Sequence, residues 1–119
     1  MLGHAKRARF GLGAERRITR TRDFERLLKE GIRRSSSGYT FYLAWRPDDG
    51  PARLGILVSR RHSPSASRRN AMKRCIREAF RLEQGQLGAL DILVRPPNGV
   101  LPGRSMIARL RQLLERIER

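Results

Sequence analysis

Apolar residues recur with the spacing of an α-helix in the segment that follows residue 21. Phe24, Leu27 and Leu28 stand at positions i, i+3 and i+4, which lie on one face of a helix. Thr21 is a residue type that caps helix N-termini, and Gly31 is one that ends helices. The pattern predicts a first helix over about residues 22 to 30.

A second helical pattern lies between residues 68 and 81. At about 100° per residue, the apolar side chains of this segment share one arc: Met72, Cys75, Ile76, Ala79 and Phe80. We expect this helix to begin at residue 66 or 68, after a loop rich in Ser, and to end near Gly85. A third apolar stripe predicts a C-terminal helix: Met106, Leu110, Leu113, Leu114 and Ile117.

Other segments have the pattern of β-strands. Residues 39–45 alternate in the way of a half-buried strand, whereas residues 53–59 and 90–95 are short apolar runs typical of buried strands. Residues 47–51 contain Pro, Asp and Gly and predict a turn, so we expect the first two strands to form an antiparallel hairpin. The order strand, helix, strand between residues 53 and 95 predicts a crossover connection.

The length of 119 residues, with 39% hydrophobic content, fits one domain with a modest core. We expect a single domain over residues 19–119. Residues 1–18 are rich in Gly, Arg and Ala without periodicity, and this composition predicts a mobile basic arm.

Charge changes this picture by indicating a partner. The formal net charge is +16, which favours a polyanion and above all nucleic acid. Residues 60–81 carry eight Lys or Arg residues against one acid, Glu78, and residues 1–22 carry seven against Glu15. Arginine supplies 24 of the 27 cations; it suits phosphate and base contacts, although a GC-rich genome would give the same bias.

The predicted second helix places cations beside its apolar arc. Its polar face carries these residues: Asn70, Lys73, Arg74, Arg77 and Arg81. Like charges at i,i+4 repel without a partner, so a binding face is favoured over a merely solvated one. For Asn70 two interpretations stay open, a local cap or turn hydrogen bond and a contact to a base or ribose.

Aromatic residues in the first strand raise the possibility of base stacking. Alternation places Tyr39, Phe41 and Trp45 on one face of the sheet and Tyr42 on the other. We assign the larger set to packing, and we treat Tyr42 and Phe24 as candidate RNA-facing aromatics.

The chain offers little material for catalysis. Its two histidines, His4 and His62, fall in the arm and in a loop, its acids are not clustered for two metal ions, and no Walker-type loop is present. Cys75 is the only cysteine, which excludes an internal disulfide and a thiol metal cluster. Without a signal peptide or an apolar span, we expect a cytoplasmic protein that does not contact membrane.

Residues 69–81, RNAMKRCIREAFR, resemble the signature of the bacterial ribonuclease P protein subunit. Three flanking motifs agree in order: Asp23-Phe24 followed by Gly31, RLGI leading to VSRR at residues 53–61, and DILVRP at residues 91–96. Together the matches span about residues 16 to 118. The resemblance implies an α/β (α+β) two-layer sandwich in which three helices pack on one mixed sheet of three to four strands, with a left-handed crossover.

The same resemblance implies a divided enzyme. An RNA subunit with Mg²⁺ would remove the 5′ leader from precursor tRNA, while the protein binds the catalytic RNA and the leader and contributes no catalytic residue and no metal site. We expect one protein per RNA and no obligate homo-oligomer. The alternatives are a ribosomal or RNA-chaperone protein of similar fold and a DNA-binding regulator, the latter disfavoured because no helix-turn-helix is apparent.

The resemblance also implies site residues. The positions expected to bind RNA are Arg60, Arg61, Arg68, Arg69, Asn70, Lys73, Arg74 and Arg77. A cleft for the leader, between the first helix, the sheet and the basic helix, would be lined by Phe24, Tyr42 and Arg61. Two departures from the family pattern are Ala71, where a second Arg is usual, and a loop at residues 61–66 that lacks the common Gly-Asn.

Overall fold

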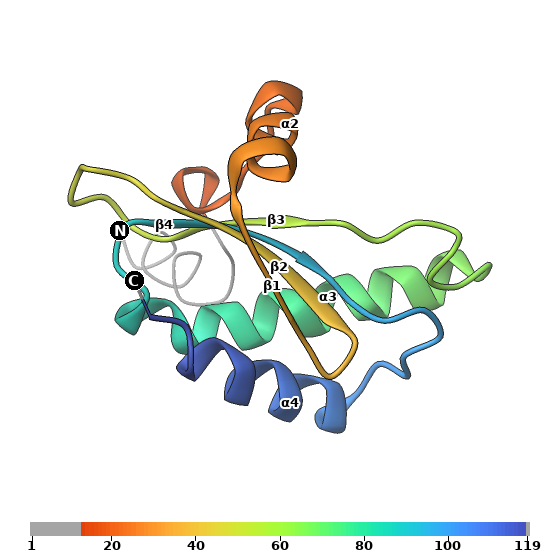
Figure 1. Cartoon of the computed structure of the whole chain (residues 1–119). Coiled ribbons are helices and arrows are strands. Elements are labelled where there is room, and N and C mark those ends of the chain that lie inside the picture. The colour runs from red at the N-terminus through yellow and green to blue at the C-terminus, as the bar shows by residue number, and fades with distance from the viewer. Residues whose placement is uncertain (1–12, 119) are drawn as a thin grey trace, which may run out of the picture.

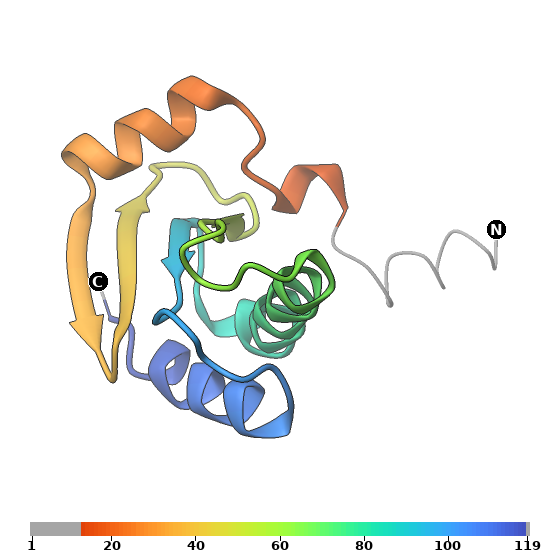
Figure 2. The ribbon, with the colours of Figure 1, turned by 90° about the vertical axis from the view of Figure 1, so that its right-hand side faces the viewer.

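The computed structural model describes residues 13–118, in which one mixed sheet lies between helices (Figure 1). The helices are α2 (Thr21–Glu30), α3 (Ala66–Glu83) and α4 (Arg104–Glu115), with short 3₁₀ turns η1 (Ala14–Arg16) and η2 (Gln84–Gln86). The strands are β1 (Ile32–Ser36), β2 (Tyr39–Trp45), β3 (Arg53–Ile56) and β4 (Leu90–Arg95). Helices α3 and α4 cover one face of the sheet, and α2 stands over the other (Figures 1 and 2). The α/β class and the three predicted helices are confirmed.

The strand order β1-β2-β4-β3 contradicts one prediction. Strands β2 and β3 do not form a hairpin, because β4 lies between them, antiparallel to β2 and parallel to β3. Residues 90–94 of β4 are all buried, which is what the centre of a sheet requires. The parallel pair β3–β4, joined through α3, confirms the predicted crossover connection.

Strand β1 was not predicted, because its sequence lacks an apolar alternation. All five of its residues are exposed, so hydrophobic patterning has nothing to detect. It pairs with β2 through a two-residue turn, in which Ser37 and Gly38 have φ values of 53° and 83°. Two positive φ values in succession are typical of the hairpin turns that match the twist of a sheet.

The main core lies between the sheet and the pair α3 and α4. Every residue of the predicted arc on α3 is buried, and so are four residues of the C-terminal stripe: Met106, Leu110, Leu113 and Leu114. Tyr39 and Phe41 are each 3% exposed, and their rings stack with centroids 6.5 Å apart. The assignment of these two aromatics to packing is therefore confirmed, and Trp45 packs partly buried against the same core.

Two ion-pair groups fix the elements to one another. Arg53 of β3 donates two hydrogen bonds to Asp91 of β4, at 2.8 and 2.7 Å, and Arg46 pairs with the same carboxylate. Glu83 at the end of α3 is buried and accepts a 2.7 Å hydrogen bond from Arg111 of α4. A buried carboxylate needs such partners, so these pairs specify how the strands and helices meet.

Residues 13–18 pack onto the domain, so the arm predicted for residues 1–18 was given too late a boundary. Ile18 is 4% exposed in a small cluster with Leu27, Tyr42 and Leu93, and its N–H donates to the carbonyl of Leu54 at 2.9 Å. One buried apolar residue and one strand-like pairing are enough to hold this segment. Residues 1–12 lie outside the described part of the chain.

The ends of the helices differ from the predictions at two capping positions. Ser65 caps α3 by accepting a hydrogen bond from the N–H of Arg68, so the capping interpretation of Asn70 is wrong. Thr21 is the first residue of α2 rather than its cap. Gly31 ends α2 as predicted: a Cβ there would lie 2.5 Å from the carbonyl oxygen of Leu27.

A candidate RNA-binding surface and groove

Helix α3 separates packing from binding by its two faces. Its apolar arc faces the core, and the polar residues predicted to bind RNA face outward, since Arg68, Asn70, Arg74 and Arg77 are exposed and Lys73 is half-buried. Ser65 fixes where the helix begins and therefore where each of these side chains emerges.

Most cations predicted for this face form no salt bridge within residues 13–118. Within residues 13–118, one cation of α3 forms a salt bridge. Arg81 pairs with Glu78 at 2.9 Å. This contact lowers the pKa of the Glu78 carboxyl and raises the pKa of the Arg81 guanidinium through their hydrogen bond. No salt bridge of the described residues involves the other predicted cations: Arg60, Arg61, Arg68, Arg69, Lys73, Arg74 and Arg77. We call these seven residues the basic surface.

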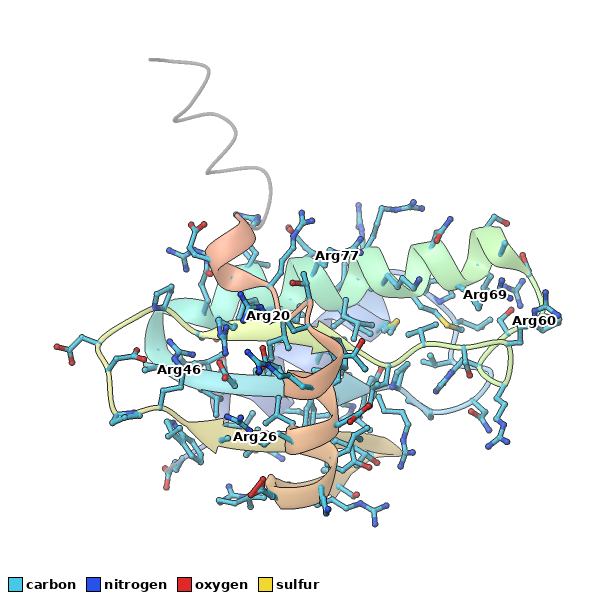
Figure 3. All side chains as sticks on the ribbon, turned by 90° about the horizontal axis from the view of Figure 1, so that it is seen from above. Arg20, Arg26, Arg46, Arg60, Arg69 and Arg77 are labelled. Atoms are coloured by element: carbon cyan, nitrogen blue, oxygen red, sulfur yellow. The ribbon has the colours of Figure 1, made fainter. Side chains whose placement is uncertain are left out.

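Arg69 has a second role that the sequence did not indicate. Its Nη1 donates to the carbonyl oxygens of Ser63 and Pro64, at 2.9 and 3.1 Å. The side chain thus ties α3 to the loop that precedes it. Figure 3 shows Arg60 and Arg69 near each other at the N-terminal end of α3, with Arg77 further along the helix.

Arg17 lies beside the basic surface, in a segment that was assigned to the arm. It lies with Lys73 and Arg77 around a hollow of about 270 Å³, whose floor is formed by β3. The bridge between Arg17 and Leu54 holds it there. Only the tertiary pairing reveals this neighbour, although the basic composition of residues 1–22 was a partial signal.

A larger groove of about 770 Å³ opens on the face of the sheet that α2 partly covers. Its walls come from the end of α2, from β2, β3 and β4, and from the loops after β3 and β4. Six of its lining residues have side chains that can contact an RNA through charge or hydrogen bonds: Thr40, Ser59, Arg61, His62, Arg95 and Asn98. Arg61 was predicted to line such a cleft, and the structure places it at this groove.

Phe24 and Tyr42 are not in the lining of this groove. Tyr42 lies on the predicted face of the sheet but is only 8% exposed, because it packs against Ile18 and Leu27. Phe24 packs over Gly55, where a Cβ would lie 3.0 Å from its ring. Tyr42 is buried in the small cluster and Phe24 packs partly buried against it, so both rings have a structural role, and contact with a leader stays a prediction for them.

The residues that sequence reasoning missed are Arg95 and His62. Arg95 is the last residue of β4, and His62 follows the basic pair of the loop. Neither carries a local signal, because their proximity depends on β4 lying next to β3. Within residues 13–118, no cluster of three or more His, Cys, Asp or Glu side chains could hold a metal ion. None of the helices in that range has both the length and the apolar composition of a transmembrane span.

The fold and this surface define a small basic α/β domain built to bind RNA. A family model described as Ribonuclease P matches residues 12–118. The ribonuclease P protein component of Saccharophagus degradans is 32% identical over 90 residues, which cover 76% of this chain and 67% of that protein. That of Acinetobacter baylyi is also 32% identical, over 91 residues that cover 76% and 70%.

Solved structures agree with the sequence relatives. The Staphylococcus aureus RNase P protein aligns with a TM-score of 0.70 at 29% identity, covering 84% of this chain and 89% of that one. The Thermotoga maritima RNase P protein, solved with 1-(4-fluorophenyl)-2-thiourea, aligns with a TM-score of 0.71 at 33% identity, covering 85% and 100%. The chain therefore belongs to the ribonuclease P protein family, and its function is that of a protein component in tRNA 5′ processing. This decides against the ribosomal, chaperone and DNA-binding alternatives.

Proposed function

We propose that the basic surface binds the catalytic RNA of ribonuclease P and that the groove takes the single-stranded 5′ leader of precursor tRNA. The observation that carries the first part is the set of seven cations without an acidic partner among residues 13–118. No carboxylate of the described residues neutralises these cations in an ion pair, so their positive charge favours binding of an anion from outside the protein. A folded RNA supplies closely spaced phosphates over the length of a helix such as α3.

The groove suits a single strand better than a duplex. Its volume of about 770 Å³ accommodates a few nucleotides, and Arg61 and Arg95 both line it. Guanidinium groups fork onto phosphate oxygens or stack on bases, which suits an unpaired strand. Apolar lining from Leu28, Ile56 and Leu57 adds surface against which bases can pack.

Catalysis in this proposal belongs to the RNA. We assign Mg²⁺ to the RNA subunit and its substrate, since the described residues offer no metal cluster to hold it. The protein would bind and orient the precursor and would neutralise phosphate charge that otherwise demands more Mg²⁺. We further propose one protein copy per RNA, since the exposed large apolar side chains of the described residues come from four different segments: Leu28, Ile32, Leu82 and Leu101.

The test is a comparison of substrates in the reconstituted complex. Precursor tRNA with its leader should bind more tightly than mature tRNA. The double variant Arg61→Gln/Arg95→Gln should weaken precursor binding by at least about tenfold, because each guanidinium makes a charge-assisted contact. Binding of mature tRNA should change much less, since it has no leader.

A matched control removes two exposed arginines elsewhere. Arg109→Gln/Arg116→Gln on and after α4 lowers the net charge by the same amount without touching the groove. Equal losses for the two double variants, or equal losses on precursor and mature tRNA, would contradict the assignment of the leader to this groove.

A further inference from the structure

The loop between β3 and α3 contains a turn that is closed by a histidine side chain. The backbone N–H of Ser59 donates to Nδ1 of His62 at 2.9 Å, and the N–H of His62 donates to the carbonyl of Ser59 at 2.9 Å. The turn therefore closes twice, once through the backbone and once through the imidazole.

This turn is also fixed from outside. The N–H of Gly99, in the loop after β4, donates to the carbonyl of His62 at 2.9 Å, and Arg69 holds the next two carbonyls from α3. His62 is 7% exposed and Ser63 is 6% exposed. A side chain held this closely is preorganised, because its orientation is fixed before a ligand binds.

The hydrogen bond from Ser59 indicates which ring nitrogen carries the proton. A backbone N–H can only donate, so Nδ1 of His62 is an acceptor. A neutral imidazole that accepts at Nδ1 has its proton on Nε2, whereas an imidazolium would place a second proton against the N–H of Ser59. In this arrangement the ring presents one neutral N–H donor.

Nε2 of His62 has no hydrogen-bond partner among the described residues. Among residues 13–118, every side-chain nitrogen or oxygen that is enclosed from solvent has a hydrogen-bond partner, and the ring contacts of His62 with other described residues are all at Nδ1. Nε2 therefore reaches solvent. His62 lines the groove together with Arg61 and Arg95.

We propose that the Nε2–H of His62 donates a hydrogen bond to an acceptor atom on the edge of one leader base and so makes the groove selective at one leader position. The inference rests on the proposed binding of the leader in this groove. The phosphate groups of the leader bind preferentially to the charged guanidinium groups of Arg61 and Arg95, which are stronger partners for an anion than a neutral imidazole. A nearly buried neutral donor discriminates instead between bases, because a base that presents a second donor, or no acceptor, leaves the N–H without a partner.

Two variants separate the donor from the turn. In His62→Asn, the Oδ1 atom takes the place of Nδ1 and can accept from Ser59, but nothing replaces the Nε2–H. In His62→Gln, the amide nitrogen takes the place of Nε2 and keeps the donor, but the acceptor for Ser59 is lost. The first variant therefore tests base selectivity, and the second tests the turn.

The experiment uses the protein reconstituted with ribonuclease P RNA and a pool of precursor tRNAs that are randomised in the leader. Relative cleavage rates within the pool give the base preference at each leader position, and mature tRNA competition gives the dependence on the leader as a whole. The wild-type protein should show a preference of about three- to tenfold at one position, the size expected for one hydrogen bond. His62→Asn should slow the preferred leaders to the rate of the others, whereas His62→Gln should keep the preference with a lower melting temperature.

Each other outcome has a definite meaning. A wild-type complex without base preference, a His62→Asn variant that keeps it, or equal loss in both variants would overturn the role of the Nε2–H. If the complex does not distinguish precursor from mature tRNA at all, the proposed binding of the leader fails first, and the role of His62 fails with it.

Discussion

The strongest quantitative prediction concerns the salt dependence of RNA binding. The perturbation is the pair Lys73→Gln/Arg77→Gln on the outward face of α3, where Lys73 is half-buried and Arg77 is exposed. Arg69 donates to loop carbonyls, so we count the remaining six members of the basic surface as phosphate contacts. If each phosphate contact releases about 0.7 counterions, six contacts predict that a fourfold rise in salt concentration weakens RNA binding about 300-fold.

Removing two of the six contacts should reduce that factor to about 50-fold. The assay is the equilibrium binding of the protein to ribonuclease P RNA over a range of salt concentrations, plotted as the logarithm of the affinity against the logarithm of the salt concentration. The melting temperature of the double variant should stay at the wild-type value, because neither side chain lies on the buried arc of α3.

The control is again Arg109→Gln/Arg116→Gln, which removes two exposed charges near the C-terminus. This control should leave the slope close to that of the wild type. If both double variants lowered the slope equally, the interaction would depend on net charge rather than on the basic surface. A wild-type slope near zero would refute the reasoning altogether.

Three further predictions concern folding. Phe80→Ala should cost about 3–5 kcal/mol in the free energy of unfolding, since Phe80 is 1% exposed in the main core; urea denaturation measures it, and a loss below about 1 kcal/mol would contradict that burial. Arg69→Ala should cost about 1–2 kcal/mol through the two lost carbonyl contacts, whereas Arg68→Ala, at an exposed site, should cost almost nothing in the same assay. Burial raises the pKa of the Tyr39 phenol, so the stability that the neutral phenol provides is complete below a pH of about 10 and falls above it. Urea denaturation at pH 9 to 11 should therefore show a smaller alkaline loss of stability for Tyr39→Phe than for the wild type. Identical pH profiles for the two proteins would contradict this prediction.

The helices were predictable because their signals are local. The arc of α3 repeats every three to four residues, and Ser65, which caps it, lies beside the residues it caps. Nothing outside this segment is needed to infer that its cations face away from the core. The most specific part of the site, the outward face of α3, could therefore be predicted from the sequence.

The sheet was less predictable because its signals are not local. Nothing in β2 or β3 indicates that β4 will lie between them, since a seven-residue connection (46–52) suits a hairpin and also a step across one strand. β1 lacks an apolar side to detect. The groove inherits this limitation: Arg95 comes near Arg61 and His62 only because β4 lies next to β3.

The aromatic residues show the limit of alternation as a guide. Alternation placed Tyr42 on the correct face of the sheet. It could not show that Ile18, which precedes α2, covers that face. A candidate base-stacking residue therefore became part of a small core. The same segment pairs with Leu54 and places Arg17 beside the basic surface. The basic composition of residues 1–22 only suggested such a position.

The central claim is that this chain binds and positions RNA while a separate RNA breaks the bond. The most direct measurement is the rate of 5′ leader removal from precursor tRNA as a function of Mg²⁺ concentration, for the RNA alone, for the purified protein alone, and for the two together. The account predicts that the protein alone is inactive and that adding it to the RNA lowers the Mg²⁺ concentration needed for cleavage. Cleavage by RNA-free protein, or an unchanged Mg²⁺ requirement in the complex, would contradict it.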